Sequence, residues 1–427
     1  MEEAAWWRSS EPASVRDVVR RSFEARLLCI SSEEALSWRN SLSYVGGTPD
    51  PLDTVICSHE YERAEVTLPP DGPLSHPYPW LRRVAAESKT LYTASGMAAI
   101  AGWLTGVAGV AAQRDQHHVV LTNQVYYETQ RLFGLAGLQH VTIRGFAGLD
   151  EILDAMAQAR QPVAVLLDST YPGGDPASVA RVMRAADPER VGCVAWDSTC
   201  APAVADPCAS LTSLPVALAV LRSHPKLDQL GLELCGFGSA TIAYDGPAEP
   251  HPSSWGSQLR FYVESVMEVS GTFAPASSVR LMARSGVLPV PPLAVDANAR
   301  VRGANRIGRS VLARELEATG RFVVRAYEHA CFVTIHLLGP AAPSREDELD
   351  AEVYALEALG AQHGMAVWRS ASFGFHYTAL SAYEAKGPPE TRGLPPHGVI
   401  RMAFGAHDPD VCEDVAVLVA DYLRGRW

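Results

Sequence analysis

Residues 191–199, Val191-Gly192-Cys193-Val194-Ala195-Trp196-Asp197-Ser198-Thr199, decide the fold class. The first six residues form a short run that is typical of a buried strand, and the carboxylate of Asp197 follows it directly. Ligands of open α/β sheets bind outside the carboxyl ends of the strands. We therefore expect Asp197 to face a ligand, and note that a helix N-cap or an Asx turn would also place an aspartate here.

The chain around this stretch repeats the pattern. Apolar runs at 119–121, 163–167 and 240–243 each suit a buried parallel strand. Residues 149–159 and 177–186, which lie between such runs, have helical periodicity. Alternating strands and helices predict an α/β fold with a mostly parallel sheet, which we assign to a large domain over residues 71–285.

Two turn-rich segments divide the rest of the chain. Leu68-Pro69-Pro70-Asp71-Gly72-Pro73 ends a region of mixed composition, and we expect residues 1–70 to form an N-terminal arm. Leu288-Pro289-Val290-Pro291-Pro292 interrupts a helical region that resumes over 297–317. A smaller α+β C-terminal domain over 286–427 would then contain strands near 322–327 and 332–338 and a final helix over 410–423.

The composition favours a small-molecule partner. The 427 residues include 36 basic and 48 acidic side chains, and the net charge of −12 repels nucleic acid and anionic membrane surfaces. Residues 91–112 have no charged side chain but several glycines, so we expect a buried helix rather than a membrane span. The N-terminus lacks a signal-peptide pattern and the eight cysteines contain no CxxC pair, so we expect a cytoplasmic chain with reduced thiols and no metal site.

Chemistry that depends on lysine has three candidates: Lys89, Lys226 and Lys386. Lys226 lies in Arg222-Ser223-His224-Pro225-Lys226-Leu227, between a helical stretch and an apolar strand candidate, where a loop at a sheet edge would expose it to a ligand. Desolvation there would lower the pKa of the lysine and free its amine to form a Schiff base. A solvated surface lysine is the alternative.

Three further segments could bind a phosphate, a flat ring and a carboxylate, respectively. Ser95-Gly96-Met97 opens a small-residue helix whose backbone N–H groups could approach a phosphate. Tyr126 or Tyr127 could stack on a ring, and Arg401, a charge within an apolar run, needs a partner such as a carboxylate. A simple helix cap, a core aromatic residue and an internal salt bridge are the respective alternatives.

Taken in order, these segments resemble the cystathionine γ-synthase and β-lyase family, the Cys/Met-metabolism group of fold type I pyridoxal 5′-phosphate (PLP) enzymes. The resemblance runs from about residue 60 to the end of the chain and implies a homodimer or homotetramer with shared active sites. It implies that Lys226 binds PLP as a Schiff base, that Asp197 faces the pyridine nitrogen and that Tyr126 stacks on the ring. These three are the implied catalytic residues.

The same resemblance assigns the remaining candidate positions. The implied cofactor-binding residues are Ser95, Gly96, Met97, Thr199 and Ser223, joined by Tyr61 and Arg63 from a neighbouring subunit. Ser372 and Arg401 are implied to bind the substrate carboxylate.

The chain departs from the family pattern near the implied lysine. Pro225 replaces a threonine, which removes a hydroxyl and an N–H from the phosphate side, and Leu227 stands where an aromatic residue is usual. Tyr171-Pro172 occupies the position of an Asn-Pro that would contact the ring hydroxyl. These departures bear on the reaction more than on cofactor binding.

The resulting hypothesis is a PLP-dependent lyase or transferase of amino-acid metabolism. Arg401 and Ser372 would hold the carboxylate of an amino acid or amino-acid conjugate, and Lys226 would move the Cα proton. A β- or γ-substituent on sulfur would then be eliminated or replaced. One alternative is transamination or decarboxylating oxidative deamination of a cysteine S-conjugate in specialised metabolism, and another is a non-catalytic binding or scaffold subunit with the same fold.

Overall fold

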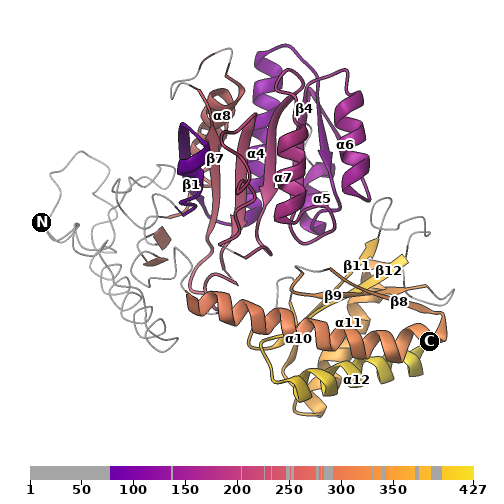
Figure 1. Cartoon of the computed structure of the whole chain (residues 1–427). Coiled ribbons are helices and arrows are strands. Elements are labelled where there is room, and N and C mark those ends of the chain that lie inside the picture. The colour runs from indigo at the N-terminus through magenta and orange to yellow at the C-terminus, as the bar shows by residue number, and fades with distance from the viewer. Residues whose placement is uncertain are drawn as a thin grey trace, which may run out of the picture.

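The computed structural model describes residues 77–427 except 136–137, 203, 226, 232, 247–250, 252–253, 276–277, 280, 283–291, 328–329, 339–342, 344, 371–374 and 386–396. The expected N-terminal arm, residues 1–70, lies outside the described residues. Two β-sheets organise the described chain (Figure 1). Strands of the first sheet lie between residues 87 and 244, and strands of the second lie between residues 322 and 403.

The large sheet has seven strands, and all of them except β7 run in the same direction. Its order is β1 (Glu87–Thr93), β7 (Gly238–Tyr244), β6 (Ala217–Ser223), β5 (Val191–Asp197), β4 (Val163–Asp168), β2 (His118–Thr122) and β3 (Val141–Gly145). The strands from β6 to β3 pair in parallel, whereas β7 is antiparallel to both β6 and β1. The predicted mostly parallel α/β sheet is confirmed.

The prediction of a parallel strand at 240–243 is wrong, because these residues belong to antiparallel β7. A parallel strand needs a crossover connection, which is usually a helix. No helix occurs in the described part of the connection between β6 and β7, so the chain turns back beside the strand it has just left.

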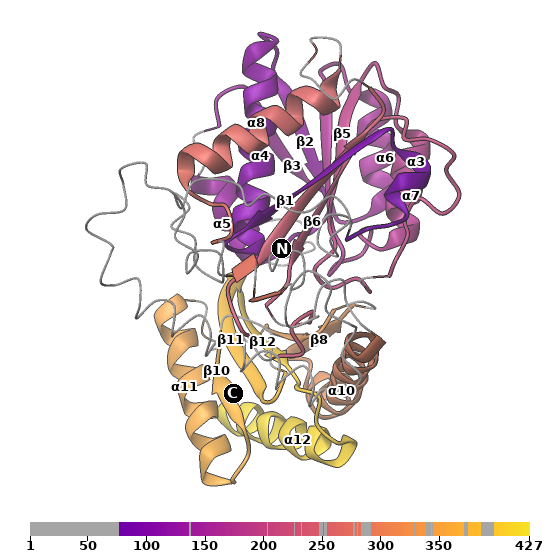
Figure 2. The same cartoon turned by 90° about the vertical axis from the view of Figure 1, so that its left-hand side faces the viewer.

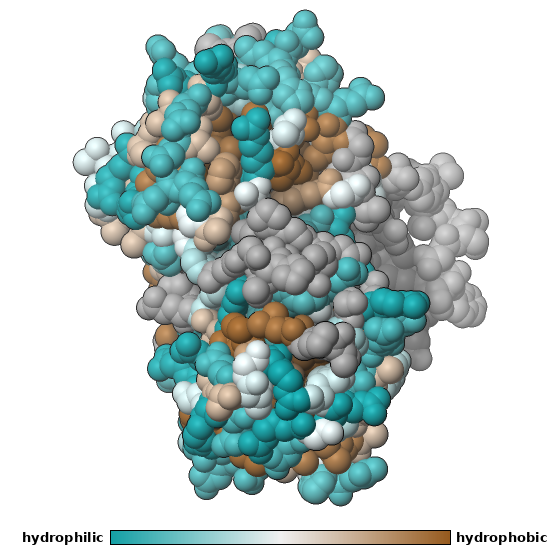
Figure 3. Space-filling model, turned by 90° about the vertical axis from the view of Figure 1, so that its right-hand side faces the viewer, coloured by the Kyte–Doolittle hydropathy of each residue, from teal (hydrophilic) through white to brown (hydrophobic). Residues whose placement is uncertain are grey.

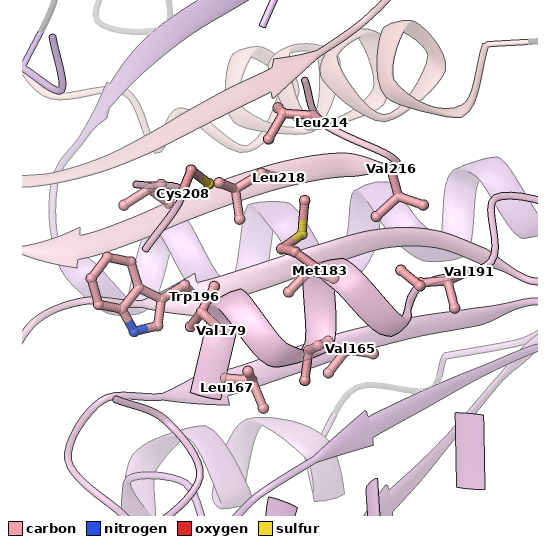
Figure 4. Packing of buried hydrophobic residues seen from close by; sticks show 14 of the residues in the cluster. Val165, Leu167, Val179, Met183, Val191, Trp196, Cys208, Leu214, Val216 and Leu218 are labelled. Atoms are coloured by element: carbon pink, nitrogen blue, oxygen red, sulfur yellow. The ribbon is translucent and has the colours of Figure 1, made fainter. Parts of the chain in front are cut away.

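Helices cover both faces of the large sheet (Figure 2). Successive side chains of a strand point to opposite faces, so Val163 and Val165 reach one core while Ala164 reaches the other. In the first core, Trp196 and Met183 pack among valine and leucine side chains (Figure 4). The first core contains α3 (Leu81–Val84), α6 (Leu149–Gln158) and α7 (Pro176–Ala185), and the second contains α4 (Gly96–Gln113), α5 (Tyr127–Leu135) and α8 (Trp255–Ser270).

The apolar stretch at 91–112 contains most of α4. By length and composition this helix could cross a membrane, but 56% of its 18-residue window is buried, and it packs between the large sheet and α8. The prediction of a buried helix that opens at Ser95-Gly96-Met97 is confirmed. Residues 87–93 form β1, which is paired along its length with β7, and the helix begins only at Gly96.

The second sheet is smaller and has three helices on one face. Its order is β10 (Val367–Arg369), β11 (Thr378–Ala385), β12 (His397–Ala403), β9 (Val333–Leu337) and β8 (Phe322–Ala326), and only β10 and β11 pair in parallel. The short 3-10 helix η1 (Glu317–Thr319) leads into β8. The apolar face packs against α10 (Pro292–Leu316), α11 (Glu346–Gln362) and α12 (Pro409–Arg426). The predicted smaller α+β unit at the C-terminus is confirmed.

The residues before Lys226 differ from the prediction of a helical stretch. Residues 217–223 form β6, which pairs with β5 on one side and β7 on the other, and six of its seven residues are buried. A short apolar run can form either a buried helix or a buried strand, and its periodicity does not distinguish the two. Pairing on both edges decides the outcome here.

The surface combines hydrophilic regions with apolar patches. The face shown in Figure 3 is mostly hydrophilic, and its hydrophobic side chains gather in separate patches. Large exposed apolar side chains of the described chain include Phe261 and Val269 on α8 and Trp368 on β10.

The contact between α4 and α8 yields a test of the fold. A Cβ on Gly106 would lie 2.5 Å from a methyl carbon of Val263, whereas a Cβ on Gly303 of α10 would meet no heavy atom of the described residues within 4 Å. Overpacking costs about 1–3 kcal/mol, so we expect Gly106→Ala to lower the free energy of unfolding. Gly303→Ala should raise it by about 0.5–1 kcal/mol, because alanine favours a helix. Denaturant unfolding checks both, and a stabilising Gly106→Ala would contradict the packing.

Candidate active site

The polar ends of three parallel strands meet at one edge of the large sheet. β4 ends in Asp168 and β5 in Asp197, and these two aspartates are paired in register. β6 ends in Ser223, two residues beyond Leu221, which pairs with Asp197. Since parallel strands share the direction of their carboxyl ends, this edge brings residues together that are far apart in the sequence.

The first turn of α4 is pressed against the end of β6. A Cβ on Gly96 would lie 2.5 Å from the Cβ of Ser223, and a Cβ on Gly238 would lie 2.4 Å from the carbonyl carbon of Ser95. Glycine at both positions therefore lets the helix start approach the strand end. This corner combines a helix N-terminus, with Met97 in its first turn, and the Ser223 hydroxyl, which is a donor set suited to a phosphate.

Ser95 caps the helix that it precedes. Its hydroxyl oxygen accepts a hydrogen bond from the Ala98 N–H at 3.1 Å and so caps α4. The hydroxyl hydrogen can still donate to a ligand, because a serine hydroxyl both accepts and donates.

Thr199 connects Asp197 to the corner where Gly96 meets Ser223, which is called the phosphate corner below. The Thr199 hydroxyl donates to Asp197 Oδ1 at 2.6 Å and accepts from the Ser223 N–H at 3.0 Å. The Thr199 N–H also donates to Asp197 Oδ1, so the aspartate forms an Asx turn. Burial raises the pKa of Asp197, while the bonds from Thr199 and the charge of Arg222 lower it. A cationic ligand group beside Asp197 would favour its ionised form.

Asp168 is a site residue that the sequence reasoning missed. Its Oδ2 accepts from the Tyr126 N–H and its Oδ1 from the Thr170 N–H, each at 2.8 Å. Burial raises the pKa of Asp168 to about 7, and the charge of Asp197 contributes to the shift. Asp168 directly follows the apolar run 163–167, so the strand-end argument that found Asp197 would have found it too.

Arg401 reaches this edge from the smaller sheet. It lies on β12, is only 2% exposed, and donates from Nη1 to the Tyr126 hydroxyl at 2.9 Å. Its guanidinium carbon lies 5.4 Å from the Tyr126 ring centre and 5.3 Å from that of Phe332, within range of cation–π attraction. Tyr126 therefore joins the two sheets, with its N–H on Asp168 and its hydroxyl at Arg401. Stacking of Tyr126 on a cofactor stays a prediction.

Four predicted site residues lie outside the described residues: Tyr61, Arg63, Lys226 and Ser372. The structure brings together the other eight, which are Ser95, Gly96, Met97, Tyr126, Asp197, Thr199, Ser223 and Arg401. The residues on either side of Lys226 are described, and Leu227 is buried between the two sheets with Tyr171, Cys331 and Phe332.

Comparison with protein-family models and with curated protein sequences gave no match. Solved structures do match. Cystathionine γ-synthase from Xanthomonas oryzae pv. oryzae, in complex with cystathionine, has a TM-score of 0.55 and 16% identity over 90% of this chain and 92% of its own. Serine palmitoyltransferase from Sphingomonas wittichii has a TM-score of 0.52 and 12% identity over 93% of this chain and 83% of its own.

A third similar structure is the cystathionine γ-lyase CalE6 from Micromonospora echinospora. It has a TM-score of 0.50 and 20% identity over 80% of this chain and 83% of its own. The chain has the fold type I architecture of these enzymes. The resemblance to the cystathionine γ-synthase family is thus confirmed at the level of the fold.

The raised pKa of Asp168 predicts how stability changes with pH. The folded chain binds this proton more tightly than the unfolded chain, so the stabilisation is complete at about pH 4 and is lost as the pH rises to about 7. Asp168→Asn removes the titration. Relative to this variant, we expect the free energy of unfolding of the cofactor-free wild-type chain to fall by up to about 1.4 kcal/mol per pH unit in this window. Denaturant unfolding at several pH values measures it, and parallel curves would contradict the assignment.

Proposed function

We propose that this chain is an enzyme that uses PLP, attached through Lys226, to act on an amino acid or an amino-acid conjugate. The observation that carries the proposal is the convergence at one sheet edge of the Gly96 and Ser223 corner, Asp197 and Arg401. The sequence adds Lys226 three residues after Ser223. These groups supply a phosphate site, an acid for a ring nitrogen, an amine for an aldehyde and a cation for a substrate carboxylate.

The donor set fits the cofactor group by group. The α4 N-terminus and the Ser223 hydroxyl suit the dianionic phosphate, because both present hydrogen-bond donors to negative charge. Asp197 suits a protonated pyridine nitrogen. It is buried, and the Thr199 hydroxyl lies between it and Ser223. In this proposal Tyr61 and Arg63 reach the phosphate of a neighbouring subunit. When bound, PLP withdraws electrons from the carbon that carries the substrate amine.

The protein residues have separate tasks around that chemistry. Asp197 keeps a proton on the ring nitrogen, which makes electron withdrawal effective. Arg401, with Ser372, binds the substrate carboxylate and so orients the Cα–H bond. Lys226, as a free amine, would take the Cα proton of the substrate and return it. The burial of Asp197 and Arg401 keeps both charges in a low-dielectric setting, where they act strongly.

We propose that the reaction is elimination or replacement at a C–S bond. Cystathionine, which is bound in the similar cystathionine γ-synthase structure, is an amino acid that contains such a bond. Release of thiol and keto acid with ammonia, but without carbon dioxide, would support elimination, and release of thiol with formation of a new amino acid would support replacement. Release of carbon dioxide from a cysteine S-conjugate would support decarboxylating chemistry instead. The departures at Pro225, Leu227 and Tyr171 favour testing both reactions, because they lie beside the implied cofactor site.

Covalent attachment of PLP yields the direct test. We expect borohydride reduction of the PLP-treated chain, followed by digestion and mass spectrometry, to find a pyridoxyl group on Lys226. Lys226→Ala should abolish the label. Lys89→Ala is the matched control, since Lys89 on β1 forms a 3.0 Å ion pair with Glu264 and should not affect labelling. An unlabelled wild-type chain would overturn the proposed function.

Arg401 yields a test of substrate binding. A hydrogen bond to a charged group contributes about 1.5–3 kcal/mol, so Arg401→Gln should raise KM for an amino-acid substrate about 10- to 150-fold. A carboxamide analogue of the same substrate lacks the carboxylate and should react with the two proteins at similar KM. Steady-state kinetics on both compounds makes the comparison, and an equal loss on both would argue against a carboxylate role for Arg401.

A further inference from the structure

Buried polar side chains on both sides of position 226 in the sequence are hydrogen-bonded to one another. They are Arg222, His224 and Asp228. Asp228 is fully buried and receives two hydrogen bonds from Arg222, Nε to Oδ2 at 2.7 Å and Nη2 to Oδ1 at 2.6 Å. His224 Nδ1 donates to the same Oδ2 at 2.6 Å. One carboxylate therefore holds residues two and four positions before Lys226, and itself lies two positions after it.

The same guanidinium also reaches the loop that follows Asp197. Arg222 Nη1 donates to the carbonyl oxygens of Ser198, in a short hydrogen bond, and of Ala201, at 3.1 Å. Arg222 is thus hydrogen-bonded at once to the segment that carries Lys226 and to the segment that begins with Asp197. A planar guanidinium has five donors in a rigid arrangement, which allows one side chain to make all these bonds.

His224 anchors the segment to a third element. Burial lowers the pKa of His224, so the neutral ring donates from Nδ1 and accepts at Nε2 from the Ser239 hydroxyl at 2.9 Å. The His224 N–H donates to the Phe237 carbonyl at 2.9 Å. These bonds fix the segment to the start of β7, which borders the phosphate corner through Gly238.

Net stability is a weak reason for such a cluster. Two buried charges lose their hydration, and apolar residues of similar size often stabilise a fold equally well or better. Burial alone would raise the pKa of Asp228, but the charge and hydrogen bonds of Arg222 hold it well below the usual range, so the pair is ionic. What an ion pair with fixed hydrogen bonds supplies is a defined geometry.

We infer that Arg222, Asp228 and His224 are positioning residues, which fix the segment carrying Lys226 at a set distance from Asp197. The inference rests on the proposed function. A rigid cofactor that bonds to an amine at one point and to a carboxylate at another needs that distance held to within about 0.5 Å. Misplacement by about 1 Å costs on the order of 100-fold in rate.

The test is a pair of matched double variants. Arg222→Met with Asp228→Asn removes both charges and leaves an amide oxygen for His224. Its control is Arg83→Met with Asp206→Asn, since Arg83 forms a 3.0 Å ion pair with Asp206 and donates to the carbonyl oxygens of Cys208 and Leu211. Arg222→Lys is the second test variant. It keeps the charge opposite Asp228 but cannot bond to both segments in the same way.

We expect amide hydrogen exchange of residues 198–201 and 222–230 in the cofactor-free chain to rise by about tenfold or more in both Arg222 variants, but not in the control. With PLP bound, the induced circular dichroism of the cofactor should fall. kcat should drop by about 100-fold, with KM within about threefold.

Unchanged exchange in a folded Arg222 variant overturns the inference. Raised exchange with unchanged cofactor dichroism and kcat also overturns it, since the cluster would then only stabilise the fold. If the double variant does not fold, Arg222→Lys decides by the same readouts. Failure of the wild-type chain to bind PLP overturns the proposed function separately, and the exchange data still show whether Arg222 holds the two segments together.

Discussion

Parallel pairing of β4, β5 and β6 is the constraint on which the rest of the site depends. Because these strands share one direction, the polar residues that follow their apolar runs, Asp168, Asp197 and Ser223, all emerge at the same edge. Gly96 then allows the start of α4 to approach Ser223 closely enough to form the corner that we propose binds a phosphate. The smaller sheet adds Arg401 from the other side. Change of direction in any one strand would remove its residue from the site.

Charge at this edge is concentrated where little water remains. Burial raises the pKa of both Asp168 and Asp197, since an ionised carboxylate without hydration is costly. Arg222 and Arg401 supply the positive charge, yet Arg222 is engaged by Asp228 and Arg401 by the Tyr126 hydroxyl. A cationic ligand group placed beside either aspartate would favour its ionised form. In the proposed function, a protonated ring nitrogen beside Asp197 supplies such a group.

Much of the site could be anticipated from local sequence, and the failures have identifiable causes. A polar residue after an apolar run led to Asp197, and the same signal stood at Asp168 but was not used. The helix start at Ser95-Gly96-Met97 was recognisable because its signal is a short motif. The sequence before Lys226 predicts a helical stretch where β6 lies, because a short apolar run fits both structures until its neighbours are known. Arg222 and Asp228 stood beside Lys226 throughout, but nothing local shows that their side chains meet.

By itself, the sequence determined which segments are buried, which residues end the strands, and in what order the chemically capable side chains follow one another. These properties depend on neighbours within a few positions along the chain, so periodicity and turn residues express them. Only the tertiary structure decided the antiparallel direction of β7, the contact of Gly96 with Ser223 and the bond between Tyr126 and Arg401. That bond joins residues 275 positions apart. Its existence depends on how two separately formed sheets pack, which no local pattern encodes.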